Sequence, residues 1–225
     1  ETWELTDLPY GRKPIGSKWV YKLKCDEKGD IIRRKARLVA QGFSQKFGVD
    51  YDEVFAPVVR SSTFRLLLSV AGVRGYAVRQ FDIKTAFLNG NLDEEIYLKQ
   101  PAGFQNGHKV YKLKKSLYGL KQAARVWNQT LHNELVKNDC KQSETDKCLY
   151  SLESDDEICY LLVHVDDMLV AYSNEALMTK LMSSIGKTFE MKDLGFVKHF
   201  LEIDVSKDEK GNFMINQKRY IDKIV

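Results

Sequence analysis

The sequence predicts an α+β fold, in which helices and mostly antiparallel strands mix without strict alternation. Two strand–turn–strand patterns and two long amphipathic patterns carry this prediction. The chain has 225 residues, which suffices for one large domain or two small ones with a substantial core. Its hydrophobic content of 44% and charged content of 29% are ordinary for a globular protein. No apolar run approaches membrane-spanning length, so no membrane partner is expected.

The first strand–turn–strand pattern is basic. Residues 17–24 alternate in polarity, residues 26–30 (DEKGD) read as a turn, and residues 31–40 return as a second strand. Because side chains alternate along a strand, two sets of residues each share a face. These sets are Trp19, Tyr21 and Leu23 in the first strand, and Arg33, Lys35 and Arg37 in the second. The pattern predicts a basic hairpin that can close over a ligand.

The next elements are a helix, a strand and a longer helix. Ser61 or Ser62 is expected to cap a helix that runs to about Gly75, and a strand from Ala77 to Ile83 follows. Asn89-Gly90 signals a turn, after which a strong helix is expected from Leu120 to about Asn138. The apolar stripes of the two helices are Phe64, Leu67, Leu68 and Ala71, and Leu120, Ala124, Trp127, Leu131 and Leu135.

The second strand–turn–strand pattern, residues 158–172, places Asp166 and Asp167 where the chain turns. Carboxylates held side by side repel each other, so a cation is expected to compensate them or one stays protonated. The alternative is a solvated turn, in which Asp is common. Asp82 ends an apolar strand and is the best candidate for a third carboxylate ligand.

The C-terminal third continues the mixed pattern. Asn174 is expected to cap a helix ending near Gly186, and residues 196–205 and 213–215 are expected to form strands around a Gly211-Asn212 turn. The last residues resemble an amphipathic helix. Since the chain begins at Glu1 without Met, it is expected to be a piece of a longer polypeptide. Four cysteines without zinc-like spacing indicate reduced, structural thiols in an intracellular protein: Cys25, Cys140, Cys148 and Cys159.

Positive charge is concentrated in two stretches although the net charge is only +4. Residues 12–46 hold eleven Lys or Arg against three acids, and residues 109–125 hold six and no acid. Such clusters suit contact with a polyanion, the alternative being a solvated charged face. Three features together indicate nucleotidyl transfer. The carboxylates suit Mg²⁺, the basic hairpin could neutralise a triphosphate, and the basic stretch over residues 109–125 could follow a nucleic-acid backbone.

Seven ordered motifs then resemble the reverse transcriptase of copia-type retrotransposon Pol polyproteins over nearly the full chain. They are GSKWVYKLK (16–24), RRKARLVAQGFSQ (33–45), DYDEVFAPVVR (50–60), QFDIKTAFLNG (80–90), KSLYGLKQAARVW (115–127), HVDDMLVAY (164–172) and FLEI (200–203). The resemblance implies right-hand polymerase fingers and palm, the palm being an antiparallel sheet backed by helices. Residues 1–76 would be mainly fingers with the basic hairpin 17–40, and residues 77–225 mainly palm, with fingers residues interspersed at about 90–115. The thumb and RNase H are not included, so an isolated fragment is expected to polymerise poorly.

The resemblance also implies the site residues. Asp82, Asp166 and Asp167 match the catalytic, metal-binding aspartates, and Ile83 would offer its backbone carbonyl to the metal. Two Mg²⁺ ions are implied, with Mn²⁺ as a substitute. The deoxynucleotide contacts would be Lys35, Arg37, Phe87, Tyr118 and Gly119. The primer and template contacts would be His164, Val165, Phe200, Leu201, Glu202 and Ile203, and Lys198 is a candidate proton donor to pyrophosphate, although a surface lysine is the simpler interpretation.

Three positions depart from the family pattern. His164 stands where Tyr is usual, Ala124 where Pro is usual, and Glu202 where Gly is usual. None removes a catalytic carboxylate, but Glu202 is expected to weaken the primer contact. The three departures also leave open a second function, that of a decayed or co-opted, non-catalytic nucleic-acid-binding module. A metal nuclease built on the same carboxylates is a third hypothesis.

The resulting prediction is an RNA-directed DNA polymerase core that transfers nucleotides from deoxynucleoside triphosphates to a primer 3′-hydroxyl on an RNA or DNA template. The implied partners are RNA template, DNA or RNA primer, deoxynucleotides, and the rest of the Pol polyprotein, namely thumb, RNase H and integrase. The implied location is a cytoplasmic virus-like particle, with the nucleus as an alternative.

Overall fold

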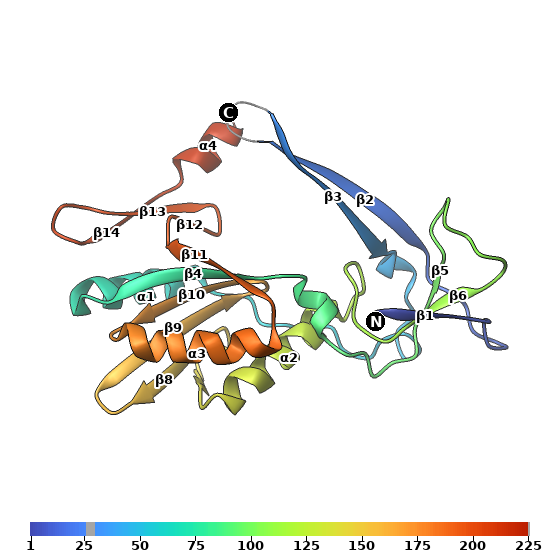
Figure 1. The fold of residues 1–225 in the computed structure, drawn as a ribbon, viewed down its shortest axis with the longest axis horizontal. Coiled ribbons are helices and arrows are strands. Elements are labelled where there is room, and N and C mark those ends of the chain that lie inside the picture. The colour runs from blue at the N-terminus through green and yellow to red at the C-terminus, as the bar shows by residue number, and fades with distance from the viewer. Residues whose placement is uncertain (26–29, 225) are drawn as a thin grey trace. The chain divides into compact units, whose positions relative to one another are not determined.

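The computed structural model describes residues 1–25 and 30–224. It divides into two compact units, whose elements are labelled in Figure 1. The first unit comprises Glu1–Ala56 and Ala86–Thr130, and the second comprises Pro57–Thr85 and Leu131–Val225. The strands that pair in the described ranges do so antiparallel, and helices are interspersed among them, which confirms the mixed fold with antiparallel sheets.

The first unit holds two small sheets. One has the order β1 (Trp3–Thr6), β6 (Val110–Leu113), β5 (Tyr97–Lys99), and the other pairs β2 (Ser17–Cys25) with β3 (Ile31–Ala40). Two short 3₁₀ turns, η1 (Gly42–Ser44) and η2 (Ala86–Asn89), complete its regular structure. Its core is apolar and is formed by Ile15, Leu38, Ala40, Ile96, Leu98, Leu113, Leu117, Leu120 and Ala123.

The β2–β3 pair confirms the strands of the predicted basic hairpin, whereas residues 26–29 of its predicted turn lie outside the described residues. Trp19 is opposite Leu38, which places the apolar face toward the unit's core. Lys35 is opposite Lys22, and Arg37 is opposite Val20. Since directly opposite residues share a face, the basic side chains gather on the other side of the hairpin.

The second unit is built on a six-stranded sheet. Its order is β11 (Met191–Phe196), β4 (Ala77–Ile83), β10 (Asp167–Tyr172), β9 (Glu157–His164), β8 (Leu149–Ser154), β7 (Lys141–Gln142). A three-stranded sheet follows in the order β12 (His199–Phe200), β13 (Ile203–Lys207), β14 (Phe213–Asn216). The helices are α1 (Ser61–Arg74), α3 (Glu175–Thr188) and α4 (Lys218–Ile224), while α2 (Ala123–Lys137) begins in the first unit and ends in the second.

The six-stranded sheet is covered on both faces. On one face Phe64 and Leu67 of α1 share a core with Leu169 of β10 and with Phe200 and Val205 of the three-stranded sheet. The apolar side of α3 lies on the other face, where Met178 and Met182 border the same cavity as Phe81 of β4. In Figure 1 these strands form the layer between α1 and α3. Because neighbours along a strand alternate, residues 78, 80 and 82 of β4 project toward the α1 face.

The N-terminus of α1 corrects the predicted cap. Arg60, not Ser61 or Ser62, occupies the N-cap position, since its backbone is extended where the helix begins. The Arg60 side chain makes no capping hydrogen bond to the helix. The carboxylate of Asp146 takes this role from 86 residues away: it accepts the Arg60 backbone N–H at 3.3 Å and the Thr63 hydroxyl. A cap supplied by tertiary structure leaves no local sequence signal. The predicted stop at Gly75 is confirmed, with φ at 71°.

Three further boundaries differ from the predictions. The helix expected from Leu120 begins at Ala123, because residues 117–122 form successive tight turns, and its inner stripe runs through buried Ala123 rather than half-buried Ala124. The helix capped by Asn174 continues to Thr188, two residues past Gly186. The strand expected over 196–205 is instead the end of β11 followed by β12 and β13, since the chain reverses at Leu201 and Glu202.

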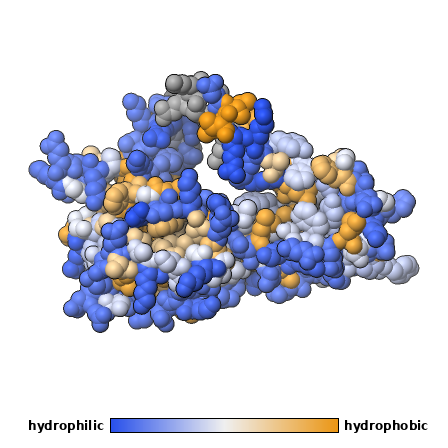
Figure 2. All heavy atoms as spheres, viewed as in Figure 1, coloured by the Kyte–Doolittle hydropathy of each residue, from blue (hydrophilic) through white to orange (hydrophobic). Residues whose placement is uncertain are grey.

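The remaining sequence predictions concern cysteines and surface. Cys140, Cys148 and Cys159 are buried free thiols, and burial raises their pKa to about 12, 12 and 11, as expected for structural thiols. None of the helices in the described ranges is long and apolar enough to cross a membrane. Hydrophilic residues cover most of the face drawn in Figure 2, with smaller hydrophobic areas between them.

Candidate functional site

Two of the three predicted catalytic aspartates lie side by side in the sheet. Asp82 of β4 is the direct register partner of Asp167 of β10. Opposite residues of an antiparallel pair project from the same face with Cβ atoms about 4.5–5.5 Å apart. The two carboxylates therefore share the α1 face of the sheet, and both are half-buried.

Asp166 belongs to the two-residue turn that joins β9 to β10, and Asp167 is already a strand residue. The backbone carbonyl of Asp166 accepts a hydrogen bond from the Ile83 N–H at 2.8 Å, which ties the turn to the end of β4. Val165, the other turn residue, has a φ of 55°, a left-handed conformation that β-branched residues adopt only at a cost. The sheet thus holds the turn in a strained conformation beside the carboxylates.

The electrostatics of the three carboxylates are mutually unfavourable. Burial raises the pKa of Asp167, and the negative charges of Asp166 and Asp82 raise it further. Gln80 opposes this by donating to Asp167 Oδ1 at 3.4 Å, and His164 opposes it through its charge. A bound cation would relieve the same repulsion, since it favours all three ionised forms.

The donor set fits a hard divalent cation. Carboxylate oxygens are the ligands that Mg²⁺ and Mn²⁺ prefer. Within the described ranges, however, no three or more His, Cys, Asp or Glu side chains are arranged to hold a metal ion. The backbone therefore places Asp82 and Asp167 next to each other, with Asp166 in the adjoining turn. Their carboxylates would have to rotate toward a common ion to bind it.

A row of polar residues crosses four strands at this point. His164 of β9 is opposite Asp167, and Lys192 of β11 is opposite Asp82. The His164 ring meets Phe200 edge-on, with centroids 6.4 Å apart. Sequence reasoning missed Lys192 because the segment MKDLGF contains Gly195 and a bulge and does not alternate clearly. It also missed Gln80, which the period-two spacing from Asp82 would have found.

The predicted primer contacts divide into buried and exposed residues. Phe200 and Ile203 are buried in the core shared with α1, where Phe200 contacts Phe64 at 5.3 Å between ring centroids. Leu201 and Glu202 form the β12–β13 turn with φ values of 51° and 60°. Glu202 pairs with Lys223 of α4 at 2.9 Å.

Lys198, the candidate proton donor, is exposed between β11 and β12 and borders a cavity at the base of the three-stranded sheet. Lys192 is the lysine that lies directly across from Asp82.

The predicted nucleotide-binding residues belong to the first unit, and three of them contact one another. The Phe87 and Tyr118 rings lie 4.6 Å apart between centroids, and the Arg37 guanidinium lies 5.3 Å from the Tyr118 ring centroid. Lys35 is one pleat away on the same face as Arg37. Gly119 has a φ of 93°, and a Cβ there would meet the Ala40 carbonyl at 2.1 Å, so this glycine permits close backbone packing.

The basic stretch over residues 109–125 is partly neutralised within the first unit. Lys112 pairs with Glu95, Lys114 with Glu1 and Glu4, and Arg125 with Glu53, at 2.7–3.4 Å. On the β2–β3 hairpin, Lys22 and Lys35 are directly opposite each other. Like charges in that arrangement are destabilising, and a polyanion would relieve them.

Comparison with known proteins supports a single family. A family model described as "Reverse transcriptase (RNA-dependent DNA polymerase)" matches residues 1–225. The chain is 41% identical to the Retrovirus-related Pol polyprotein from transposon TNT 1-94 of Nicotiana tabacum, over 100% of this chain and 17% of that protein. It is 38% identical to the Retrovirus-related Pol polyprotein from transposon RE1 of Arabidopsis thaliana, over 98% of this chain and 15% of that protein.

Among solved structures, the chain is similar to the foamy viral protease-reverse transcriptase in complex with double-stranded DNA, at 10% identity and a TM-score of 0.42, over 92% of this chain and 33% of that one. The chain spans about a sixth of the length of the two plant polyproteins. Its identity to both, together with the family model that matches every residue, shows that the chain belongs to the reverse transcriptase (RNA-dependent DNA polymerase) family, in its copia-type Pol polyprotein branch.

Proposed function

We propose that this chain is the core of an RNA-directed DNA polymerase that extends a primer 3′-hydroxyl on an RNA or DNA template. The observation that carries the proposal is the pairing of Asp82 with Asp167 across adjacent strands, with Asp166 in the turn beside them. The six-stranded sheet with its covering helices would be the palm. The first unit, with the basic hairpin, would supply the fingers.

Asp82, Asp166 and Asp167 would hold two Mg²⁺ ions, for which Mn²⁺ can substitute, together with the backbone carbonyl of Ile83. When bound, such ions stabilise the charge that develops on the attacking and leaving oxygens of an in-line phosphoryl displacement. The raised pKa of Asp167 supports this role, because the residue is poorly compensated without a cation. Lys192, opposite Asp82, adds a cationic side chain to the carboxylate row.

The first unit would bind the incoming deoxynucleotide. Arg37 and Lys35 would neutralise its triphosphate, since both lie on the basic face of the hairpin. Phe87 and Tyr118 would pack against its sugar and base, with Gly119 keeping the backbone close, and Phe87 would exclude a 2′-hydroxyl. The contact between the Phe87 and Tyr118 rings supports their acting together.

The primer would lie along the α1 face of the palm sheet, near His164 and Val165, and against the β12–β13 turn. Phe200 supports this assignment because it joins that turn to His164. The remaining partners would be the thumb, RNase H and integrase segments of the polyprotein, within a cytoplasmic virus-like particle.

Primer extension by a parent polyprotein fragment that includes a thumb tests the proposal. Asp82→Asn, Asp166→Asn and Asp167→Asn are expected to lower incorporation by at least about a hundredfold, as losses of charge stabilisation at a reacting centre do. Asp155→Asn is the matched control, because Asp155 is an exposed turn residue with a φ of 53°, which Asn tolerates. Unchanged incorporation in the three variants would refute the proposal.

A non-catalytic nucleic-acid-binding module is distinguished by a second measurement. Mn²⁺-dependent binding of a deoxynucleoside triphosphate to the chain is expected, and it is expected to weaken in Asp82→Asn but not in Asp155→Asn. A chain that binds nucleic acid but shows no metal-dependent nucleotide binding would support the binding module. Cleavage of the template without extension would support a nuclease.

A further inference from the structure

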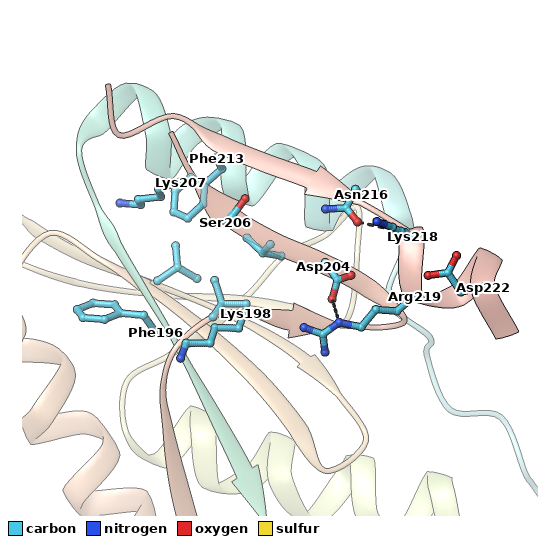
Figure 3. Close-up of a pocket in the computed structure, with 13 residues that line it drawn as sticks. Phe196, Lys198, Asp204, Ser206, Lys207, Phe213, Asn216, Lys218, Arg219 and Asp222 are labelled. Atoms are coloured by element: carbon cyan, nitrogen blue, oxygen red, sulfur yellow. Dashed lines mark hydrogen bonds and ion pairs between the residues drawn. The ribbon is translucent and has the colours of Figure 1, made fainter. Parts of the chain in front are cut away.

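A cavity of about 900 Å³ lies in the second unit between the sheet and its C-terminal attachments. One wall is the end of β11 and the residues after it, and the other is formed by β13, β14 and the start of α4 (Figure 3). Val78 of β4 also borders it, four residues before Asp82 on the same strand. Its volume falls in the range of pockets that hold small molecules.

The floor of this cavity is apolar and belongs to the protein's core. Val78, Val197 and Val205 line it, and all three are less than 10% exposed. Two aromatic rings face the opening, Phe213 of β14 and Phe196 of β11. Phe196 is 65% exposed, and the Arg79 guanidinium lies 5.9 Å from its ring centroid. An apolar guest would cover both the floor and this ring.

The charges around the opening favour an anion. Four cationic residues line the cavity against two carboxylates: Lys198, Lys207, Lys218 and Arg219 against Asp204 and Asp222. Asp204 is already compensated, because it contacts Arg219 at 3.2 Å and His199 at 3.0 Å.

The lysines at the opening, by contrast, have no carboxylate partner among the described residues. The Lys207 ammonium lies 4.5 Å from the Phe213 ring centroid and forms no ion pair within the described ranges. Lys198, across the opening, is exposed and likewise makes no ion pair within those ranges. An anionic group bound between the two walls would be attracted by the ammonium groups of Lys198 and Lys207.

We propose that this cavity binds a small amphipathic anion, with an aromatic or otherwise apolar body on the valine floor and a carboxylate or sulfonate between Lys198 and Lys207. The site is separate from the carboxylate row, and the proposal does not depend on polymerase activity. None of the three aspartates lines the cavity.

Anilinonaphthalene sulfonate is a suitable probe, since it joins an aromatic body to one anionic group. Its fluorescence titration of the chain is expected to show one saturable site, and the neutral anilinonaphthalene is expected to bind more weakly. Lys207→Glu and Phe196→Ser are each expected to lower the affinity for the probe roughly three- to tenfold, the first because a positive charge is lost and the second because an apolar contact is lost. Both side chains are exposed, so neither change should unfold the chain.

Lys180→Glu is the matched control, because Lys180 is an exposed lysine of α3 that does not line the cavity. It is expected to leave probe binding unchanged, and circular dichroism of each variant is expected to match the parent. Methyl resonances of Val78 and Val205 are expected to shift on titration. Equal affinity in Lys207→Glu, Phe196→Ser and the parent, or shifts that spare both valines, would overturn the proposal.

Discussion

Left-handed backbone at residues other than glycine marks the turn that holds Asp166 and the turn between β12 and β13. Val165 adopts it between β9 and β10, and Leu201 and Glu202 adopt it between β12 and β13. For an L-residue this conformation costs on the order of 1–2 kcal/mol, so the surrounding sheets must impose it. Because strain of this kind is often retained where function needs a fixed geometry, these turns are good places to separate stability from activity.

The first residue-scale prediction concerns Glu202. Glu202→Gly is expected to raise Tm by about 2–4 °C, because glycine adopts a φ of 60° without strain and the exposed ion pair to Lys223 contributes little. Thermal unfolding measures this. Glu202→Ala is the control, since it loses the ion pair but keeps the strain, and it should show no gain. A lower Tm in Glu202→Gly would mean that the ion pair outweighs the strain.

The second residue-scale prediction follows from the raised pKa of Asp167. A carboxyl whose pKa is raised by folding favours the folded state when protonated, so its ionisation costs stability as pH rises through the folded pKa. Asp167→Asn is therefore expected to be more stable than the parent at pH 7, with the difference vanishing below about pH 4, where the unfolded carboxyl is also protonated.

Thermal unfolding at the two pH values without added metal checks this prediction. Asp155→Asn, in an exposed turn, should not gain stability at pH 7 relative to the parent. An Asp167→Asn variant that is less stable than the parent at pH 7 would contradict it.

At the scale of elements, the most informative contact is the carboxylate of Asp146 at the start of α1. Burial raises its pKa, but hydrogen bonds from Thr63, Cys148 and Arg60 outweigh this effect, and the pKa is lowered. Asp146→Ala is expected to destabilise the chain by about 2–3 kcal/mol, since it leaves several donors without an acceptor. Denaturant unfolding measures the loss.

The same contact predicts a pH dependence. Stability from a carboxyl with a lowered pKa is present above the unfolded pKa and is lost as pH falls through the folded pKa. The difference between the parent and Asp146→Ala should therefore shrink in acid. Asp146→Asn keeps an acceptor oxygen and should lose less stability. An equal loss in both variants at every pH would show that packing, not the charge, holds the helix start.

Elements with a local signal were predictable, and those defined by tertiary contacts were not. Alternation revealed β2, with β3 as its returning strand, and short apolar runs on either side of the two aspartates revealed β9 and β10. Asn174 revealed α3 because its own side chain accepts the Ala176 and Leu177 N–H groups. The β12–β13 reversal was missed because its turn is formed by Leu201 and Glu202, and Leu and Glu are not residue types that favour turns. The sequence singled out Asp82 and Asp167, which the structure makes register partners, whereas Lys192 became visible only when the β11–β4 register was known.

At the scale of the whole molecule, the proposed activity draws on both units. The aromatic–arginine cluster and the basic hairpin belong to the first, and the carboxylate row belongs to the second. The net charge of +4 hides a difference between Lys112 and Lys114, which pair with acids, and Lys18 and Lys22 on the basic face of the hairpin, which form no ion pair among the described residues. Affinity for nucleic acid should therefore depend on position and not on total charge.

A salt titration tests this distribution. Replacing Lys18 and Lys22 together by Ala is expected to reduce the slope of log affinity against log salt by up to about 2 for an RNA–DNA hybrid, if each lysine neutralises one phosphate. Replacing Lys112 and Lys114 removes the same charge but breaks internal ion pairs, so its slope should change much less. Fluorescence anisotropy measures both, and equal changes in slope would contradict the prediction.

The pairing of Asp82 with Asp167 has a consequence for how correct folding can be monitored. Side chains alternate along strands, so a slip of one residue between β4 and β10 would turn one carboxylate to the opposite face of the sheet. A chain with that error would keep its strands and much of its spectroscopic signature, yet would no longer present two acids together. Under the proposed function, the stoichiometry of Mn²⁺ binding would then serve as a quality-control assay for recombinant or engineered material, because it counts the molecules whose central sheet is in register.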